Sequence, residues 1–448
     1  MTRARAQVRC VVIGAGWSGL ACAVEAVRQG AAVTLVDAAP AIGGRARRVD
    51  LRIGDRDFTV DNGQHLLLGA CTETIALMCR LGVDPDLALF SQPFKVEYPD
   101  GWRIGAIGVP APLHLALGLV RARRVAWRDR LALAAWVAHQ RRREWHVAED
   151  CPVAELLQTQ PGALVRRLWR PLCIAAMNAE PEQASGRMFM NLLRLTLGAA
   201  ERDSRLLLTR RDLSATMPEA AFQYLNGAGA TVALRQPAAA LARSGSGWSV
   251  LLREQRMEAD QVVLALPAEA AIRLLESASI EALQPTIEKL RNLQYEPIAT
   301  VYLRYPSPVR LPGPVFALLD DAGQGRPGQW VFDRGRIEPA HQGILSVVIG
   351  APALRFERDR NVLRAAVDRQ LSAEFGLPPS LAQNIVIERR ATLLPAIGLS
   401  RPAPRLPVNG LYLAGDIAES PFPSTLEGSV RSGLEAARLA QFDASHCQ

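Results

Sequence analysis

The feature that most constrains this chain is a glycine-rich turn between a short apolar run and a segment with helical periodicity. Residues 8–13 are mostly apolar, and the turn Gly14-Ala15-Gly16-Trp17-Ser18-Gly19 follows them directly. Gly14 permits a tight turn, and Gly16 lets a pyrophosphate approach the backbone without a Cβ in the way. Gly19 lets the helix expected over 18–29 pack closely on the preceding strand. The N–H groups at the start of this helix would then favour phosphate.

An acidic residue stands where such a fold binds the adenosine ribose. A second strand is expected over 33–36, and Asp37 ends it eighteen residues after Gly19. The Asp37 carboxylate can accept hydrogen bonds from both ribose hydroxyls and would repel a 2′-phosphate, which argues against NADP. The glycine motif alone is a weak signal, but strand, motif, helix, strand and acid in this order predict a dinucleotide site.

A second glycine pair favours FAD over NAD. The segment Ile42-Gly43-Gly44-Arg45-Ala46-Arg47 resembles the second phosphate-contact element of the flavin amine oxidase and phytoene desaturase superfamily. Gly43 and Gly44 would let backbone N–H groups reach the diphosphate, and Arg45 would add a charge-assisted contact. The alternative for the arginines of this segment is a solvated loop.

The C-terminal part of the chain returns to the same cofactor. Gly415 and Asp416 follow an expected strand over 411–414, and Thr425, Leu426 and Glu427 begin an expected helix over 425–439. Asp416 is placed to bind a ribityl hydroxyl, and its alternative is an ordinary turn acid. The N–H groups at the helix start would favour the negative charge of reduced flavin. We therefore expect bound FAD, with electrons supplied by a transient nicotinamide nucleotide or by another protein.

Length and composition exclude several classes of protein. The 448 residues, 49% of them hydrophobic, can bury a large core. No stretch approaches the roughly 20 continuous apolar residues of a membrane span. Residues 1–5 lead straight into the first expected strand, so no signal peptide is expected. The seven cysteines form no CxxC pair, and no metal site is expected. We expect a cytoplasmic protein.

The excess positive charge gathers in one segment. The net charge is +8, and residues 119–147 carry Arg121, Arg123, Arg124, Arg128, Arg130, Arg141, Arg142 and Arg143 together with Trp127, Trp136 and Trp145. Arginine beside an apolar, tryptophan-bearing helix suits peripheral contact with the inner face of a membrane. A solvated helix with a core stripe suits the pattern equally. Nucleic-acid binding is the less favoured interpretation of this segment, because no recognised binding module accompanies it.

Several segments together resemble the hydroxysqualene dehydroxylase family, also called squalene-associated FAD-dependent desaturases, within the flavin amine oxidase and phytoene desaturase superfamily. They are Val60-Asp61-Asn62-Gly63-Gln64-His65-Leu66-Leu67-Leu68-Gly69, Trp169-Arg170-Pro171-Leu172-Cys173, Trp330-Val331-Phe332-Asp333-Arg334-Gly335, Arg390-Ala391-Thr392-Leu393-Leu394-Pro395-Ala396 and Thr425-Leu426-Glu427-Gly428. The resemblance runs in the same order over nearly the whole chain. Asp37 departs from it mildly, because glutamate is usual at that position.

This resemblance implies an α/β fold. It would comprise a Rossmann-type FAD-binding domain of the glutathione reductase-like, amine oxidase subclass and a mixed α+β substrate domain. Both would be discontinuous, because the expected elements alternate along the chain. We expect residues 1–90, 215–280 and 391–448 to form the FAD-binding domain. Residues 91–214 and 281–390 would then form the substrate domain, which includes the basic segment 119–147.

The resemblance also implies a reaction in which hydroxysqualene is reduced to squalene for bacterial squalene and hopanoid biosynthesis. Loss of an allylic hydroxyl, aided by a proton donor, would leave a cation that accepts hydride from N5 of reduced FAD. By resemblance, Gly63, Gln64 and His65 lie near the flavin ring. An imidazole suits proton donation near neutral pH, so His65 is the catalytic candidate. Its alternative is a buried histidine satisfied by backbone, and Asp333 and Glu427 are weaker candidates.

Two other functions stay open. The first is a phytoene-type carotenoid desaturase or a flavin amine oxidase, which would use the same flavin domain in the oxidising direction. The second is a catalytically idle FAD-containing partner that shuttles substrate between pathway enzymes. Intact cofactor elements speak against an idle protein, whereas only the reaction product separates reduction from oxidation.

Overall fold

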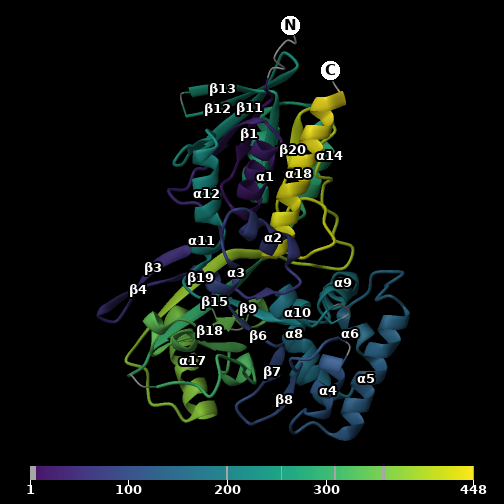
Figure 1. The fold of residues 1–448 in the computed structure, drawn as a ribbon, viewed down its shortest axis with the longest axis vertical. Coiled ribbons are helices and arrows are strands. Elements are labelled where there is room, and N and C mark those ends of the chain that lie inside the picture. The colour runs from purple at the N-terminus through teal and green to yellow at the C-terminus, as the bar shows by residue number, and fades with distance from the viewer. Residues whose placement is uncertain are drawn as a thin grey trace.

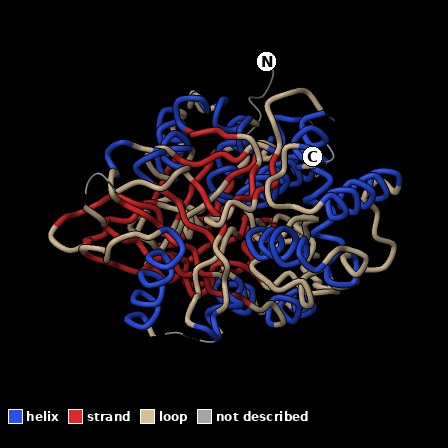
Figure 2. The backbone as a smooth tube through the Cα atoms, turned by 90° about the horizontal axis from the view of Figure 1, so that it is seen from below, coloured by secondary structure: helices blue, strands red, loops and turns tan. Residues whose placement is uncertain are grey.

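The computed structural model describes residues 7–111, 113–197, 200–253, 255–306, 309–355, 357 and 359–446. The chain folds into an α/β structure with two halves, and the half at the top of Figure 1 carries both termini. Seen from below, the strands run through the centre and left of the molecule, and helices lie above, below and to the right of them (Figure 2). Residues 1–5, on which the expectation about a signal peptide depends, lie outside the described residues.

The upper half is built on a parallel sheet with the strand order β10-β2-β1-β14-β20. Its strands are β1 (Arg9–Ile13), β2 (Ala32–Val36), β10 (Thr231–Ala233), β14 (Gln261–Leu264) and β20 (Leu411–Leu413). These short runs are almost wholly apolar because helices or other strands cover both faces of the sheet. The sheet thus joins chain segments that lie far apart in the sequence, and the α/β prediction is confirmed.

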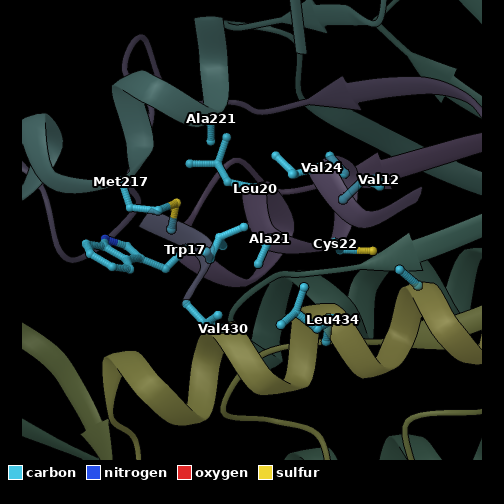
Figure 3. Close-up of a cluster of buried hydrophobic side chains, with 14 of the residues drawn as sticks. Val12, Trp17, Leu20, Ala21, Cys22, Val24, Met217, Ala221, Val430 and Leu434 are labelled. Atoms are coloured by element: carbon cyan, nitrogen blue, oxygen red, sulfur yellow. The ribbon is translucent and has the colours of Figure 1, made fainter. Parts of the chain in front are cut away.

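One face of this sheet is covered by α1 (Trp17–Arg28), α12 (Pro218–Gly227) and α18 (Leu426–His446). Figure 3 shows α1 between the other two helices, with Leu20, Met217 and Leu434 among the labelled core side chains. The contact between α1 and α18 is close, since a Cβ on Gly433 would lie 2.1 Å from the Ser18 carbonyl oxygen. The helix that we expected to end at 439 extends to His446.

The other face is covered by an antiparallel meander and two helices. The elements are β11 (Ala238–Ser244), β12 (Gly247–Leu252), β13 (Gln255–Ala259), α13 (Ala268–Ser277), η2 (Glu281–Leu283) and α14 (Gln284–Arg291). Leu283, Ile287 and Leu290 pack in one core cluster with Val11 and Val262 of the parallel sheet. Residues 283–290, which we assigned from the sequence to the substrate domain, therefore pack on the upper sheet through the apolar stripe of α14.

The lower half is built on a sheet with the order β16-β17-β18-β15-β19. It contains β15 (Tyr295–Arg304), β16 (Val315–Ala317), β17 (Trp330–Asp333), β18 (Ile344–Ile349) and β19 (Ala382–Leu393), with α17 (Arg360–Phe375) packed against it. The hairpin formed by β3 (Arg48–Ile53) and β4 (Arg56–Asp61) leans onto this sheet. Ile53 and Val60 pack there with Tyr302 and Ile344. The hairpin therefore links the first chain segment to the lower half.

A helical layer lies beside this second sheet. It comprises α4 (Leu113–Val120), α5 (Trp127–Arg142), α6 (Val153–Leu156), α7 (Gly162–Leu164), η1 (Val165–Trp169), α8 (Arg170–Met177) and α9 (Gly186–Thr196), together with β7 (Lys95–Glu97) and β8 (Arg103–Gly105). Trp136, Trp145 and Trp169 are buried in its core, and the ring centroids of Trp136 and Trp169 are 4.7 Å apart. Two of the three tryptophans of the basic segment are therefore core residues, and Trp127 alone of those three is exposed.

Short elements complete the fold between these layers. They are β5 (Leu67–Leu68), α2 (Thr72–Arg80), α3 (Pro85–Ala88), β6 (Leu89–Gln92), α10 (Glu201–Ser204), β9 (Leu206–Thr209), α11 (Leu213–Thr216), η3 (Ala322–Gln324), α15 (Arg334–Ile337), η4 (Pro339–His341) and α16 (Ala351–Leu354). Across the described residues, every helix is too short or too polar to span a bilayer.

Candidate active site

A cavity of about 900 Å³ runs between the two halves of the molecule. Both glycine-rich segments line its upper end, which we call the nucleotide end. Apolar side chains of the lower half line its other end, which we call the apolar end. Of the site residues predicted from the sequence, all line this cavity except Gly19 and the weaker catalytic candidate Asp333. The structure therefore brings together residues 14–18 and 415–427, which lie at opposite ends of the chain.

The first glycine turn has the geometry that its sequence predicts. Gly14 adopts a φ of +112°, and a Cβ there would lie 2.1 Å from the carbonyl oxygen of Ala265. A Cβ on Gly19 would lie 1.8 Å from the Gly14 carbonyl oxygen. Gly19 thus lets α1 pack against the turn. This packing requires a glycine at position 19, although Gly19 does not line the cavity. The N-terminus of α1 consequently faces the nucleotide end.

Two polar side chains flank this turn. The Asp37 carboxylate accepts hydrogen bonds from the backbone N–H groups of Ala15, at 2.6 Å, and Ala39, at 2.7 Å. These bonds hold Asp37 at the edge of the cavity while its remaining lone pairs can accept hydroxyl donors. Ser18 Oγ is buried and lacks a hydrogen-bond partner among the described residues. A hydroxyl in this state beside a helix N-terminus suits a bound phosphate.

The second glycine pair docks against the first turn. Gly43 and Gly44 have φ values of +98° and +61°, and the Gly43 N–H donates to the Ala15 carbonyl at 2.8 Å. A Cβ on Gly44 would lie 3.0 Å from Gly16 Cα. The two glycine-rich segments therefore form one cradle. Substituting the glycines of either segment with residues that carry side chains would fill the cradle.

Arg45 and Asp416 are paired with each other rather than standing apart. Arg45 Nη2 lies 2.7 Å from Asp416 Oδ2, and Ser424 Oγ donates to the same oxygen at 3.0 Å. Arg45 Nη1 also donates to the Arg390 carbonyl at 3.0 Å. The sequence predicted separate contacts to the diphosphate and to the ribityl chain. In the structure one ion pair ties the N-terminal and C-terminal cofactor elements together, and both residues still line the cavity.

The C-terminal element closes the nucleotide end. Gly415 has a φ of +101°, and its N–H donates to Ser432 Oγ at 2.9 Å. Thr425 Oγ1 accepts the Gly428 N–H at 3.1 Å at the start of α18. The first N–H groups of a helix have no partner within the helix, so the segment Thr425 to Glu427 presents a partial positive charge to the cavity.

The Glu427 side chain has a structural role. Its carboxylate accepts hydrogen bonds from the Glu73 and Thr74 N–H groups, at 3.1 and 2.9 Å, and from Thr74 Oγ1 at 2.7 Å. It also pairs with Arg431 at 2.6 Å. Glu427 thus braces the start of α2 against α18. Asp333 similarly accepts the Leu311 N–H at 2.9 Å and does not line the cavity.

His65 lies between the two ends of the cavity. Its Nδ1 is 2.9 Å from the Gly63 carbonyl oxygen, which can only accept, so Nδ1 carries a proton. In the neutral ring Nε2 is then an acceptor. Burial lowers the pKa of His65 below its ordinary value of 6.5, and Arg45 lowers it further, while the bond to Gly63 opposes this shift. His65 is therefore mostly neutral at pH 7, and it must first be protonated to act as an acid.

Gln64 is held by the lower sheet. Its backbone N–H donates to Thr300 Oγ1 at 3.2 Å, and Ser346 Oγ donates to its side-chain Oε1 at 3.0 Å. Gly63 adopts a φ of +105°. This turn positions the segment 63–65 at the junction of the two halves, where a ring bound at the nucleotide end would meet the apolar end.

The apolar end was not predicted residue by residue. Its walls include Leu172 and Ala176 of α8, Phe189 and Leu192 of α9, and Val315, Trp330, Phe332 and Val348 of the lower sheet. Phe189, Leu192 and Thr196 share a face of α9 at helical spacing, a signal that marks a buried face but not what covers it. Lys95, paired with Glu97 at 2.6 Å, is a charged residue at this end.

These features fit FAD in the upper part of the cavity. Asp37 would bind the adenosine ribose, and the glycine cradle with the N-terminus of α1 and the unpartnered Ser18 hydroxyl would bind the diphosphate. Asp416 and the N-terminus of α18 would lie along the ribityl chain and the ring. Within the described residues, no cluster of three or more His, Cys, Asp or Glu side chains could hold a metal ion.

Comparisons with known proteins agree with this geometry. The family model described as "Flavin containing amine oxidoreductase" matches residues 17–440. Proteins named "Hydroxysqualene dehydroxylase" from Sinorhizobium fredii and Rhodopseudomonas palustris are each 30% identical, over 96% of this chain and 97% of theirs. A "Probable zeta-carotene desaturase" from Synechococcus elongatus is 20% identical, over 96% of this chain and 98% of its own.

A solved structure supports the fold. The crystal structure of a putative protoporphyrinogen oxidase from Exiguobacterium sp. 255-15 superposes with a TM-score of 0.69, covering 98% of this chain and 99% of that one at 19% identity.

Proposed function

Because this chain belongs to the flavin-containing amine oxidoreductase family and is an FAD-dependent oxidoreductase, we propose that it reduces hydroxysqualene to squalene. Two relatives that are 30% identical to this chain, over 97% of their own length, carry the name of this activity. We place the reaction in bacterial squalene and hopanoid biosynthesis, in the cytoplasm, with electrons delivered transiently by a nicotinamide nucleotide or a protein.

The observation that carries the proposal is the continuity of the cavity. One space of about 900 Å³ has a nucleotide end built of glycines and an apolar end built of leucine, phenylalanine and tryptophan side chains. An elongated polyene with one hydroxyl matches the apolar end, because its burial there requires few hydrogen bonds.

The reaction replaces a carbon–oxygen bond with a carbon–hydrogen bond and releases water, so it consumes a hydride and a proton. Reduced FAD supplies the hydride when bound. The walls formed by α8, α9 and the lower sheet exclude water and hold the polyene. We propose that His65 holds the proton at Nε2, oriented by the Nδ1 bond to Gly63, and passes it to the departing hydroxyl.

Product identification tests the proposal. Purified protein with FAD, hydroxysqualene and dithionite under anaerobic conditions should yield squalene and no product with additional double bonds. Failure to form squalene from a protein that holds flavin would contradict the proposal.

The oxidising direction is the second candidate, and the zeta-carotene desaturase relative favours it. The same apolar end would accept a carotenoid, with electrons leaving to a quinone or to oxygen. Formation of new double bonds in the presence of a quinone, without dehydroxylation under reducing conditions, would identify this activity.

A further inference from the structure

The helix α4 is apolar on the face that it turns to solvent. Residues 104–120 contain no Asp, Glu, Lys or Arg, and His114 is their sole hydrogen-bonding side chain. The inner face of α4 is fixed, since Leu115 and Leu119 pack on the helical-layer core and a Cβ on Gly118 would lie 2.0 Å from the Gly105 carbonyl oxygen. A surface helix with an inner face of this kind ordinarily carries polar residues outside. Here it does not.

The neighbouring helix α5 extends this apolar surface. The exposed large apolar side chains of the two helices are Leu113 (55% exposed), Leu117 (42%), Val120 (57%), Trp127 (62%) and Leu131 (67%). Ala134, Ala135 and Ala138 continue the exposed side of α5 beyond Leu131. We call this surface the α4–α5 face. Figure 1 shows α4 and α5, which carry this face, in the lower half of the molecule and far from both termini.

Arg130 holds the turn between the two helices. Its guanidinium donates to the Val120 carbonyl at 2.6 Å and to the Ala122 carbonyl at 2.7 Å. It also lies 4.4 Å from the centroid of the Trp127 ring. The exposed tryptophan is therefore fixed next to the end of α4 rather than free to fold back into the core.

Positive charge borders the face at both ends. Arg121, Arg123, Arg124 and Arg128 are exposed at one end, and Arg142 and Arg143 are exposed at the other. Within the segment 101–143 the acidic residue is Asp129, which is buried. The exposed acids Asp100 and Glu144 flank this segment, and Asp100 is paired with Arg167 at 2.7 Å. An apolar strip with arginines at its margins matches the boundary between acyl chains and anionic headgroups.

The face lies on the half of the molecule that holds the apolar end of the cavity. Phe94 lines that end, and it packs on the same core cluster as Leu115 and Leu119 of α4. A bilayer at the α4–α5 face would therefore lie beside the part of the protein that takes a lipophilic molecule.

We propose that the α4–α5 face docks onto a bilayer that contains anionic lipids. The leucines, Val120 and Trp127 enter the headgroup boundary, and the bordering arginines contact lipid phosphates. The docking stands independently of the reaction; the delivery of a polyprenyl substrate from the bilayer rests on the proposed function.

A membrane suits this face better than a protein partner does. Specific protein interfaces carry about one hydrogen bond per 100–200 Å². The segment 104–120 offers a partner no polar side chain except His114, which is buried. A bilayer interior demands no such bonds, and the charge at the margins supplies the attraction.

Flotation of the FAD-loaded protein with vesicles tests the docking. Wild-type protein should float with vesicles of phosphatidylcholine and phosphatidylglycerol, and much less with phosphatidylcholine alone. Leu131→Glu places a good helix former at an exposed helical position, so it should fold and weaken vesicle binding at least about tenfold. The matched control is Leu381→Glu, which alters a leucine that is 57% exposed on another surface and should bind as wild type does.

The charge is tested by a triple variant, Arg121→Gln, Arg123→Gln and Arg124→Gln. We expect vesicle binding to weaken on the order of a hundredfold. A control with the same loss of net charge is Arg56→Gln, Arg256→Gln and Arg360→Gln, which alters exposed arginines on β4, β13 and α17. This control should retain binding.

Equal flotation of wild type with neutral and anionic vesicles, no flotation with either, or equal loss in Leu131→Glu and Leu381→Glu would overturn the docking. Turnover of detergent-dispersed hydroxysqualene by Leu131→Glu should equal that of wild type. If no protein turns over hydroxysqualene while wild type still floats, the proposed function fails and the docking stands.

Discussion

The nucleotide end and the apolar end of the cavity are specified in different ways. The nucleotide end is built mainly of backbone, from glycines at positive φ and two helix N-termini, and one side-chain ion pair, Arg45–Asp416, ties its parts together. The apolar end uses side chains from α8, α9 and the lower sheet, none of which forms a contiguous motif. A backbone site tolerates little change at a few positions. A wall of apolar side chains tolerates change at most positions but sets the shape of what fits.

The largest effect is expected at the nucleotide end. Gly14→Ala would place a Cβ 2.1 Å from the Ala265 carbonyl oxygen at a φ of +112°. We expect loss of bound FAD and destabilisation by more than ~3 kcal/mol. The control is Gly30→Ala, which has a φ of +89° with no atom within 4 Å of the added Cβ and should cost only about 1 kcal/mol. Flavin absorbance and thermal unfolding measure both, and equal losses would show that strain alone, not the cradle, matters.

A substitution at the junction of the two ends should slow the reaction and leave the binding of FAD and substrate intact. His65→Ala should keep FAD but reduce dehydroxylation on the order of a hundredfold or more. Because burial holds the pKa of His65 below 6.5, the protonated fraction grows as the pH falls through that value. The wild-type rate should therefore rise as the pH falls from 8 to about 6, and the His65→Ala rate should not. Near-normal turnover by the variant would remove His65 from the mechanism.

A substitution at the apolar end should weaken substrate binding and leave FAD binding unchanged. Ala176→Phe adds a ring to a wall that lines the cavity, so it should raise KM for hydroxysqualene about tenfold and leave the FAD spectrum unchanged. Steady-state kinetics and an absorbance spectrum of the same sample make the comparison. Loss of flavin in this variant would mean that the two ends are not separable.

The smallest effect is expected where the two cofactor elements are tied together. Asp416→Asn weakens the ion pair with Arg45, whose side chain is one-third exposed. We expect FAD to bind about tenfold more weakly, or about 1–2 kcal/mol. A double-mutant cycle with Arg45→Gln should show that the two changes are not additive. Additive losses would indicate that each residue contacts FAD separately, as the sequence first suggested.

The same contrast explains what the sequence could and could not predict. The parallel strands, α1 and α18 were predictable because local glycine motifs and apolar runs specify them. The Arg45–Asp416 pair was not, because it depends on how residues 371 positions apart meet. The lining of the apolar end was missed for a similar reason. Phe189 and Trp330 look like ordinary core residues until the layers of the lower half are placed together.

The basic segment was predicted only in part. Its tryptophans were read together, but Trp136 and Trp145 fill the core and Trp127 alone of them reaches the surface. The apolar outer face of α4 was missed, because a leucine-rich stretch without charges reads as buried when its surroundings are unknown.

Single-turnover reduction of substrate tests the central claim that one cavity holds both FAD and a polyprenyl alcohol. The purified protein should be yellow, and its flavin should be reduced anaerobically and then mixed with one equivalent of hydroxysqualene. We expect the oxidised flavin spectrum to return as one squalene forms per flavin. A flavin that stays reduced in the presence of hydroxysqualene, or a protein that cannot be loaded with flavin, would contradict the account.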